Sequence, residues 1–365
     1  MGANRSLSLL GAALAAALLL ACDGDSASDC SDEPGAACVW AGTGEPGFNG
    51  DGLPRSETRL YWPVDVAFAP DGTPWVVDWN NHKVRRVLDD GTVETVVSLF
   101  HPTDVEFGQD GLIYIADWHN YRLGALDPAN GVFRVIGGDQ PGFGGDGGPL
   151  DDARFNLPAS IVFGPDGTLY VLDQLNQRIR SVGPDAQRTV STIAGTGDPG
   201  YSGDGGPADA AQLSFQQGDD SAPSGALAIG PDGHLYVADA LNFRIRRIDL
   251  ETGVIETVAG SGREGFAGDG GPALEAELGE VKDIEFGPGG RLYLADTNNN
   301  CVRAVDLSSG LIEMVWDGNA LSPQDDDASL LDRPFGIAFD PDGRLYIADT
   351  DHHRIVRVIP DSTGS

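Results

Sequence analysis

The sequence predicts an all-β fold, a six-bladed β-propeller of four-stranded antiparallel blades, and three observations support this prediction. First, 51 Gly and 23 Pro among 365 residues make about a fifth of the chain turn-forming, which disfavours long helices. Second, one strand–turn–strand unit recurs six times along the chain. Third, apolar residues alternate along the first strand of each unit. Six such units fit the radial packing of a propeller better than a sandwich.

The first residues are typical of a targeting signal rather than of a folded element. A short positive start, Met1 to Arg5, precedes the apolar run Leu7 to Leu20, whose 14 residues are too few to span a bilayer. Ala21 followed by Cys22 resembles a bacterial lipoprotein signal, in which residues 1–21 are removed and Cys22 carries the lipid. An ordinary signal sequence with a chance cysteine, or a short membrane anchor, is the alternative. The resemblance implies a lipid-anchored protein on the extracytoplasmic side of a bacterial cell envelope.

The segments that flank the repeats are expected to be unstructured. Residues 22–37 are acidic and rich in small residues, so we expect a flexible tether, and residues 361–365 are expected to form a disordered tail. Cys30 and Cys38 are close enough in sequence to form a disulfide in an oxidising compartment. With Cys22 acylated, Cys301 would be left unpaired.

Each repeat begins with an apolar strand a, turns at Pro-Asp-Gly, and continues through strand b to an Asp. Asn-x-Arg-Ile-Arg then leads into strand c, and a second turn leads into strand d. The Asp that ends strand b is found once in every blade: Asp78, Asp117, Asp173, Asp239, Asp296 and Asp349. Strand a carries bulky apolar residues at two positions on one face, as Val66 and Phe68 do in blade one, and we expect the neighbouring blade to cover them.

The ends of the repeat region predict how the ring closes. The sixth unit ends near Ile359 with only three strands, whereas residues 38–41 look like a fourth strand. We therefore expect residues 38–41 to pair with residues 354–358, which removes two exposed sheet edges. The propeller would then span residues 38–360.

The repeat motif carries a family resemblance. Asp-x-x-Asn-x-Arg-Ile-Arg, preceded by Leu-Tyr-Val-Ala-Asp, closely resembles NHL repeats, and so does Ala-Gly-Thr-Gly-Asp-Pro-Gly-Tyr-Ser-Gly-Asp-Gly-Gly-Pro-Ala at residues 194–208. The resemblance covers residues 38–360. It departs from the pattern at Cys301, where Arg is usual, at Gly289, which replaces Asp, and at His352, which replaces Asn.

Two sequence features are expected on the same face, because the b–c and d–a connections emerge together. The b–c corners carry the repeated Asp, and four d–a loops carry Gly-Phe/Tyr-x-Gly-Asp, at residues 47–51, 142–146, 200–204 and 265–269. The connections into blades two and six, Ser98 to His101 and Asp325 to Asp327, lack this motif. Metal binding by the corners or calcium binding by the loops is one interpretation. An architectural role, with each Asp accepting backbone N–H bonds or pairing with the Arg five residues on, explains every blade.

Residues that interrupt the repeat are the better site candidates. Acids occupy two positions of strand a in some blades: Asp65, Asp104, Glu106, Asp283 and Glu285. Since strand a lines the axis of a propeller, these carboxylates could converge and hold a cation such as Ca²⁺. The alternative is a set of solvated acids at a wide channel mouth.

Tryptophan and histidine are unevenly distributed among the blades. Those on the b–c/d–a face of blades six, one and two are Trp79, His82, His101, Trp118, His119, His352 and His353. They could bind a protein, peptide or glycan, or hold a transition metal through imidazole. The alternative is a set of exposed turn histidines.

Composition narrows the function. With 23 Lys and Arg against 56 Asp and Glu the net charge is −33, which excludes nucleic acid as a partner and conflicts with the RNA binding of some animal NHL proteins. We expect a monomeric binding or scaffold module without catalytic residues. The alternative is a calcium- or zinc-dependent propeller enzyme, resembling lactonases or peptide-amidating lyases. The lyase resemblance implies histidines in strand a, where this chain has Val64, Thr103, Ala159 and Phe335.

Overall fold

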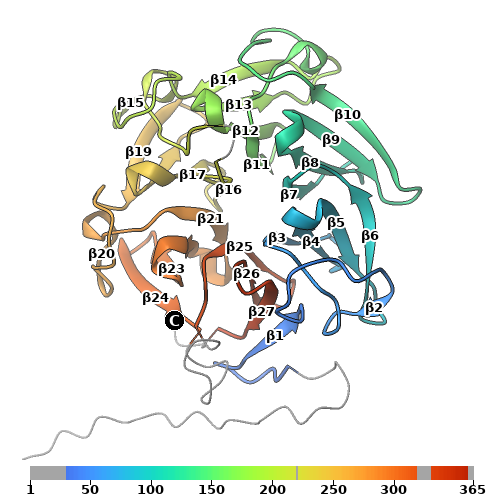
Figure 1. The fold of residues 1–365 in the computed structure, drawn as a ribbon. Coiled ribbons are helices and arrows are strands. Elements are labelled where there is room, and N and C mark those ends of the chain that lie inside the picture. The colour runs from blue at the N-terminus through green and yellow to red at the C-terminus, as the bar shows by residue number, and fades with distance from the viewer. Residues whose placement is uncertain (1–29, 219–220, 319–329, 361–365) are drawn as a thin grey trace, which may run out of the picture.

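The computed structural model describes residues 30–218, 221–318 and 330–360. Six antiparallel sheets surround a central channel (Figure 1), which confirms the all-β six-bladed propeller. The expected signal sequence, residues 22–29 of the tether including Cys22, the acidic connection at 325–327 and the tail at 361–365 lie outside the described residues. Within the described ranges, no helix is long and apolar enough to cross a membrane.

Strands a to d of each blade follow one another in sequence. Blade one contains β3 (Pro63–Phe68), β4 (Pro74–Asp78), β5 (Lys83–Val87) and β6 (Thr92–Ser98). Blade two contains β7 (Pro102–Phe107), β8 (Ile113–Asp117), β9 (Arg122–Asp127) and β10 (Val132–Gly138). Blade three contains β11 (Pro158–Phe163), β12 (Leu169–Asp173), β13 (Arg178–Val182) and β14 (Val190–Ala194).

The second half of the ring repeats this order. Blade four contains β16 (Leu227–Ile229), β17 (Leu235–Asp239), β18 (Arg244–Ile248) and β19 (Val254–Ala259). Blade five contains β21 (Val281–Phe286), β22 (Leu292–Asp296), β23 (Cys301–Asp306) and β24 (Leu311–Trp316). Blade six contains β25 (Pro334–Phe339), β26 (Leu345–Asp349), β27 (Arg354–Val358) and the N-terminal β1 (Ala37–Ala41).

Strand β1 closes the ring as predicted, because it pairs antiparallel with β27 over Ala37↔Val358 to Ala41↔Ile355. The structure joins Cys30 and Cys38 in a disulfide with a Cα–Cα distance of 5.7 Å, which fixes the chain just before this strand. Cys301 is a buried free thiol at the start of β23. The first and last described segments of the chain thus share one sheet.

Three blades have a fifth strand, which the sequence did not predict. The glycine loops contribute β2 (Leu53–Pro54), β15 (Gly206–Pro207) and β20 (Gly271–Pro272), and these pair with β6, β19 and β24 respectively. Short 3₁₀ turns complete the structure. Five occupy b–c corners: η1 (Trp79–Asn81), η2 (Trp118–Asn120), η4 (Gln174–Asn176), η6 (Ala240–Asn242) and η9 (Thr297–Asn299). The others are η3 (Leu150–Asp152), η5 (Ala208–Ala210), η7 (Ala273–Glu275) and η8 (Pro288–Gly290).

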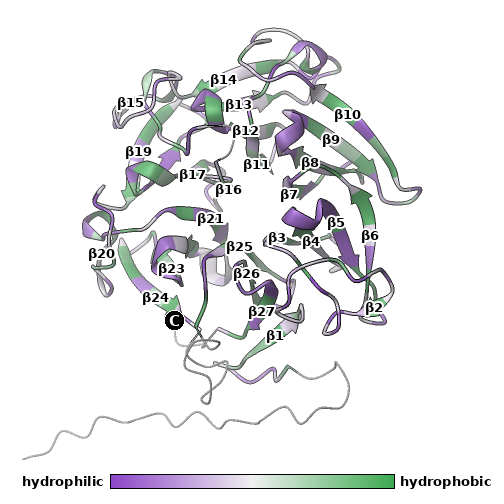
Figure 2. Ribbon diagram, in the orientation of Figure 1, coloured by the Kyte–Doolittle hydropathy of each residue, from purple (hydrophilic) through white to green (hydrophobic). Residues whose placement is uncertain are grey.

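Adjacent blades pack through an aromatic ring on strand b against one on strand a of the next blade. Tyr114 contacts Phe163 with a centroid distance of 4.9 Å, and Tyr293 contacts Phe339 at 4.7 Å. Tyr346 of blade six contacts Phe68 of blade one at 4.7 Å, so the same contact closes the ring. Figure 2 shows the corresponding hydrophobic stretches along the strands and hydrophilic residues in several of the turns near the channel.

The corner Asp is architectural, but its expected partner was wrong in four blades. Its side chain accepts a backbone N–H from the preceding connection, as Asp296 does from Gly279 at 2.8 Å. The Arg five residues on pairs with it only in blades two and six, as Arg122 does with Asp117. Elsewhere the partner is the Arg seven residues on: Arg85, Arg180, Arg246 and Arg303.

The same Arg holds the glycine loop that covers its blade. Arg303 Nη2 also donates to Asp269 Oδ1 of the loop at 2.8 Å, and Arg180, Arg246 and Arg85 contact the equivalent Asp residues. In blades two and six, where the described chain has no such loop, this Arg is replaced by Gly124 and Val356. Loop and arginine therefore occur together, and the arginine fixes the position of the loop Asp.

Candidate functional site

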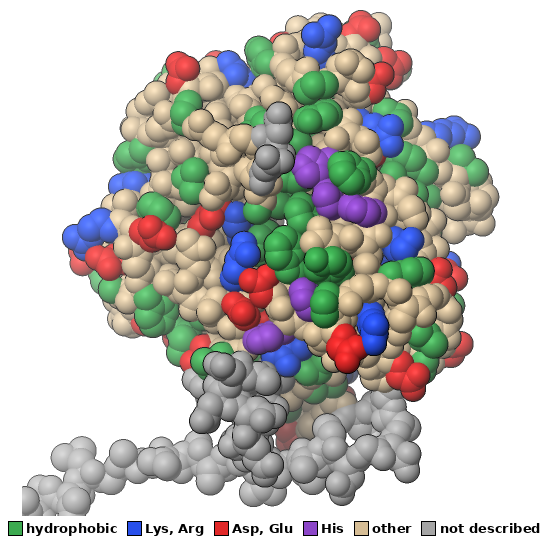
Figure 3. Space-filling view, viewed as in Figure 1, with side chains coloured by type: hydrophobic (Ala, Val, Ile, Leu, Met, Phe, Trp, Pro, Cys, Tyr) green, Lys and Arg blue, Asp and Glu red, His purple; other side chains and the backbone are tan. Residues whose placement is uncertain are grey.

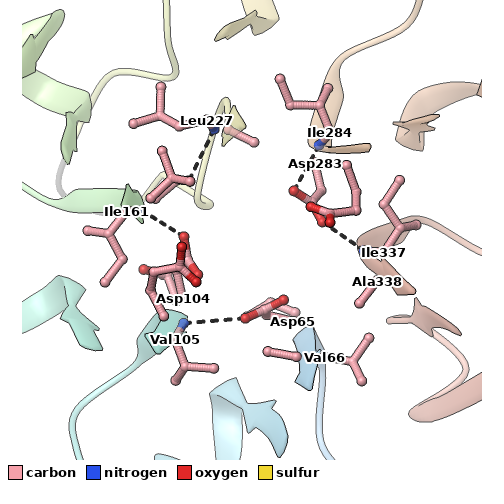
Figure 4. A pocket seen from close by; sticks show the side chains of 18 of the residues that line it. Asp65, Val66, Asp104, Val105, Ile161, Leu227, Asp283, Ile284, Ile337 and Ala338 are labelled. Carbon is pink, nitrogen blue, oxygen red and sulfur yellow. Dashed lines mark hydrogen bonds between the residues drawn. The ribbon is translucent and has the colours of Figure 1, made fainter. Parts of the chain in front are cut away.

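The channel is lined by the innermost strand of each blade, as the sequence predicted. A cavity of about 210 Å³ lies along it, and the acids from β3, β7 and β21 face this cavity. Figure 4 shows the carboxylates of Asp65, Asp104 and Asp283 arranged around the opening. Glu106 and Glu285 lie two residues further along β7 and β21 and line the same cavity.

Four of these carboxylates bond to the backbone of the next blade, and one of them is Glu106, whose Oε1 accepts the Phe163 N–H at 3.1 Å. Asp104 Oδ2 accepts the Ile161 N–H at 2.7 Å, and Asp283 Oδ2 accepts the Ile337 N–H at 2.7 Å. Asp65 Oδ2 lies 3.4 Å from the Val105 N–H. The Ser160 hydroxyl in blade three accepts the Leu227 N–H at 3.1 Å, so a neutral side chain forms the same link. These residues tie successive inner strands together.

Burial and crowding raise the pKa values of the channel carboxyl groups. Burial is the largest cause and raises the pKa of Glu285 to about 8, with the charges of Glu106, Asp65 and Asp104 adding to it. Burial likewise raises the pKa of Glu106 to about 7, despite the hydrogen bond from Phe163 N–H. The pKa of Asp104 rises to about 6, again through burial. Glu106 and Glu285 therefore exchange protons near neutral pH.

A channel cation would need several of these oxygens at once. Asp283 accepts backbone N–H bonds at both oxygens, from Ile284 at 2.8 Å and from Ile337. In the described ranges, no three His, Cys, Asp or Glu side chains are grouped so that they could hold a metal ion. The residues as arranged do not fit a metal centre, so the expected Ca²⁺ site at the channel acids has no geometric support.

A buried ion pair lies beside the channel, and the sequence analysis did not single it out. Lys282 Nζ donates to Glu280 Oε1 at 2.5 Å and to the Pro223 carbonyl at 2.7 Å. Glu280 also accepts the Ser224 hydroxyl at 2.9 Å. The available signal was Lys282 itself, which occupies the strand a position held by Val64, Thr103 and Phe335 in other blades.

On the b–c/d–a face, six residues form what we call the aromatic–histidine patch. They come from η1 and η2, the residues beside them, and the short connection before β7: Trp79, His82, Phe100, His101, Trp118 and His119. Figure 3 shows histidine side chains beside hydrophobic ones near the centre of this face, in the region of β7 and β8 in Figure 1. Five of the seven predicted face residues meet here.

The rings of the patch are in mutual contact. The Trp79 and His101 rings stack with a centroid distance of 4.2 Å, and His101 lies 4.4 Å from His82 and 4.6 Å from His119. The Nδ1 atoms of His101 and His119 contact one another. Trp118 packs against His119 at 4.3 Å. The patch is therefore a continuous surface rather than a set of separate turn residues.

Exposure within the patch separates its surface from its support. Trp118 is 0% and Trp79 8% exposed, so both tryptophans lie beneath the surface, whereas Phe100 is 50% exposed. Trp118 Nε1 donates to Gln174 Oε1 at 3.3 Å. A ligand would touch Phe100 and the histidine edges first. Phe100 was missed by the sequence analysis, although it lies in the connection noted as unusually short.

Two histidines of the patch, His82 and His101, have lowered pKa values. Burial is the main cause that lowers the pKa of His101 to about 4, and the neighbouring His119 and His82 lower it further. Burial also lowers the pKa of His82. At neutral pH these two rings are uncharged, and their ring nitrogens can donate or accept hydrogen bonds.

His352 and His353 lie apart from the patch, in the corner of blade six. His352 Nδ1 lies 3.0 Å from Asp349 Oδ2, in the place of the usual Asn. His353 Nδ1 accepts the Trp62 N–H at 3.3 Å. Trp62 stacks on Trp79 at 5.9 Å, so it joins this corner to the patch.

The position after the corner Asp explains why the patch is confined to two blades. It is Trp79 and Trp118 in blades one and two, but Thr297 and Thr350 in blades five and six. The two threonine hydroxyls donate to Pro334 and Pro63 carbonyls of the next blade at 2.6 and 2.7 Å. Blades five and six use this position as a link between blades, whereas blades one and two carry the tryptophan rings of the patch there.

Comparisons with known proteins agree with the repeat pattern. Protein SUPPRESSOR OF QUENCHING 1, chloroplastic, from Arabidopsis thaliana is 30% identical over 50% of the chain, and NHL repeat-containing protein 2 from Bos taurus is 28% identical over 62%. The chain spans 17% and 34% of the lengths of these two relatives. These matches confirm the NHL-repeat resemblance.

Solved structures share the fold at low sequence identity. An auxiliary nutrient binding protein from Bacteroides ovatus has a TM-score of 0.65 and 17% identity, with 89% of this chain and 76% of that chain covered. A gluconolactonase from Xanthomonas campestris has a TM-score of 0.56 and 15% identity, with 82% and 86% covered. The family described as SMP-30/Gluconolactonase/LRE-like region matches residues 157–365, more than half of the chain. The chain therefore belongs to the SMP-30/gluconolactonase/LRE-like family of β-propellers.

Proposed function

We propose that this propeller is a binding module whose ligand, a protein, peptide or glycan, contacts the aromatic–histidine patch. The observation that carries the proposal is the patch itself. It combines an exposed Phe100 with histidine edges over a buried Trp79, and it is built where blades one and two depart from the repeat. Aromatic side chains on a rigid support are typical of binding surfaces, because they bury much area at little entropic cost.

The lowered pKa values of two patch histidines support an uncharged ligand. Because the pKa values of His101 and His82 are lowered, these two rings add no charge that would disfavour contact with an apolar or polyhydroxylated ligand. Rings that stack at about 4–5 Å leave ring edges and faces for stacking on a sugar or for a peptide side chain. The auxiliary nutrient binding protein with the same fold is consistent with this class of function.

We further propose that Cys22 carries a lipid and that the propeller acts outside the cytoplasmic membrane as a monomer. The Cys30–Cys38 disulfide supports an oxidising compartment, since disulfides persist there and are rare in the cytosol. Radiolabelled palmitate incorporation into the full chain, lost in Cys22→Ser, is the expected result. Incorporation that is unchanged in this variant would contradict it.

The binding proposal is tested with defined ligand panels. We expect one class in a panel of oligosaccharides and unstructured peptides to change the tryptophan fluorescence of the propeller, and Phe100→Ala to weaken its binding at least tenfold. Phe266→Ala is the matched control, because Phe266 is 51% exposed on a loop of blade five. Equal loss of affinity in both variants, or none in Phe100→Ala, would remove the patch as the site.

A second candidate function is hydrolysis of a small cyclic ester, such as a lactone, in the channel. The observation that favours it is the pair Glu106 and Glu285, whose pKa values of about 7 and 8 suit general acid–base chemistry near neutral pH. Lactone hydrolysis that is lost in Glu285→Gln but retained in Phe100→Ala would support the enzyme. If the protein hydrolyses lactones no faster than buffer alone and still binds a ligand at the patch, the enzyme proposal is contradicted and the binding proposal stands.

A further inference from the structure

The outer strand of blade two, β10, has an uncovered edge. In blades one, four and five a short strand from the glycine loop pairs with the outer strand. In blade three, two hydrogen bonds between Val190 and the backbone N–H of Gly147 and carbonyl of Gly148 serve the same purpose. Blade two is reached through a connection that lacks the loop. Among the residues that the structure describes, none pairs with the outer edge of β10 near Val132–Val135.

Pairing registers identify which backbone groups are free. Phe133 pairs with Leu126 as Val93 pairs with Val87, so Phe133 occupies the position of Val93. The Val93 carbonyl accepts the Gly52 N–H at 2.8 Å from the loop. Phe133 therefore directs its carbonyl and N–H outward, and in the described ranges no loop reaches them.

The next residue of β10 whose backbone groups point outward, Val135, is also uncovered in the described ranges. Val135 pairs with Gly124 as Thr95 pairs with Arg85, so Val135 occupies the position of Thr95. The Thr95 N–H donates to Asp51 Oδ1 of the loop at 2.9 Å. The Val135 N–H is thus an outward donor. Its counterpart in blade one, the Thr95 N–H, is capped by the acidic side chain of Asp51.

Side chains of blade two have changed together with the missing loop. Gly124 replaces the arginine that binds the loop Asp, and the Phe133 ring fills the space, 2.1 Å from where a Gly124 Cβ would be. Val132 and Val135, which flank Phe133 and Arg134 on this edge, are 43% and 45% exposed. The edge is therefore both unpaired and apolar, which is the arrangement that strand addition uses.

Charge on this edge is reversed relative to blades one, four and five. Arg134 occupies the position of Glu94, Glu256 and Glu313, each of which pairs with an arginine. Opposite Arg134 is Ala125, and no ion pair of Arg134 is found within the described ranges. The edge is locally positive on a chain whose net charge is −33. At about 0.15 M salt the screening length is about 8 Å, so the local charge decides what docks.

We propose that residues 132–135 of β10 are a docking edge for an extended, acidic peptide segment of a partner protein, which adds to blade two as its fifth strand. Main-chain bonds to Phe133 give affinity, an acidic side chain caps the Val135 N–H and pairs with Arg134, and apolar residues cover Val132 and Phe133. A second copy of this chain is a poorer occupant, because it would place its own Arg134 at the edge and would itself carry a net charge of −33.

The test uses a peptide that already performs this role within the chain. A synthetic peptide with the sequence of residues 265–273, which includes the strand that covers blade five, should slow hydrogen exchange of the β10 amides at least fivefold. The same peptide with Lys in place of its Asp should protect them less. Protection should weaken with rising salt, because the pairing with Arg134 is electrostatic.

Two variants remove the edge without touching the aromatic–histidine patch. Val135→Pro deletes an outward N–H while keeping the bonds to β9, and Arg134→Glu reverses the charge; both should reduce peptide binding at least fivefold. Val135→Thr is the matched control and should bind normally. If Val135→Pro lowers the melting temperature of the propeller, the peptide affinity of Arg134→Glu is the result that tests the proposal. Equal protection of the β10 amides from exchange in all variants would overturn the proposal, and so would the absence of protection at millimolar peptide. Concentration-dependent dimers that Val135→Pro abolishes would also overturn it, because a second copy would then occupy the edge.

Discussion

Gly336 of blade six lies against Asp65 of blade one so closely that a Cβ on Gly336 would be 2.6 Å from the Asp65 Cα. The other blades separate their inner strands with a side chain at this position, such as Asp104 or Ser160, which bonds to the next strand. Blade six has no side chain there, and its strand β25 packs directly on β3. Two contacts therefore close the ring. Strand β1 pairs with β27 in blade six, away from the channel, and Gly336 packs against Asp65 beside the channel.

Gly336→Ala should destabilise the propeller more than most glycine substitutions. The added methyl group meets backbone atoms, which cannot move aside as a side chain would, and overpacking of this kind costs about 1–3 kcal/mol. Urea unfolding should show a loss of about 2 kcal/mol. Gly144→Ala is the control, because its Cβ would meet only the Arg154 Cδ, at 3.9 Å. Similar midpoints for both variants would show that the inner strands can separate freely.

Arg303→Met should be strongly destabilising. The Arg303 guanidinium is buried between Asp296 and Asp269, and its removal leaves the fully buried Asp296 carboxylate without its cation. Breaking a buried pair from one side costs about 3–5 kcal/mol. Arg247→Met, which removes partly exposed ion pairs with Asp232 and Glu256, should cost only about 1 kcal/mol. Unfolding free energies of the two variants measure the difference, and equal losses would contradict the assignment.

Repetition made the fold predictable from sequence. Six copies of one pattern identified strands a to d, and the missing fourth strand at the end identified residues 38–41 as the closing strand. The arginine that pairs with the corner Asp was harder to predict from sequence. Residues five and seven positions after Asp78 lie on the same strand, and only the geometry of the glycine loop decides which one turns inward.

The site was predictable only in part, because its geometry depends on distances between blades. Sequence placed Trp79, His101 and His119 on one face, yet which rings are buried depends on how the corners of neighbouring blades tilt. Likewise, convergence of Asp65 with other channel acids follows from the repeat. The hydrogen bond that Asp65 accepts from the Val105 backbone depends on the spacing of the inner strands, which the sequence does not give.

Removal of the Cys30–Cys38 disulfide should loosen the closing strand rather than unfold the ring outright. The cross-link closes a short loop directly before β1, and loops of this length contribute about 2–3 kcal/mol in the chain-entropy description. Cys30→Ser/Cys38→Ser should therefore lower the melting temperature and speed hydrogen exchange in β1 and β27. Exchange in blade three should stay unchanged, which separates local fraying from global loss. A uniform increase across all blades would contradict this prediction.

Glu285→Gln should make the protein more stable at alkaline pH and leave it nearly unchanged at acidic pH. Burial raises the pKa of Glu285 to about 8 in the folded protein, whereas an unfolded glutamate titrates near 4.3. Between these values the folded state binds more protons than the unfolded state. Stability of the native sequence therefore falls as pH rises from about 4 to about 8.

Glutamine cannot ionise, so the variant lacks this loss while keeping the shape of the side chain. The unfolding free energy of Glu285→Gln should exceed that of the native sequence by at least about 1 kcal/mol at pH 8.5 and match it near pH 4.5. Glu313→Gln, on the exposed face of blade five, should show no such divergence with pH. Parallel stability curves for Glu285→Gln and the native sequence would mean that the channel carboxyl group ionises at its ordinary pKa. Glu285 would then not be the acid–base group that a lactone-hydrolysing channel requires.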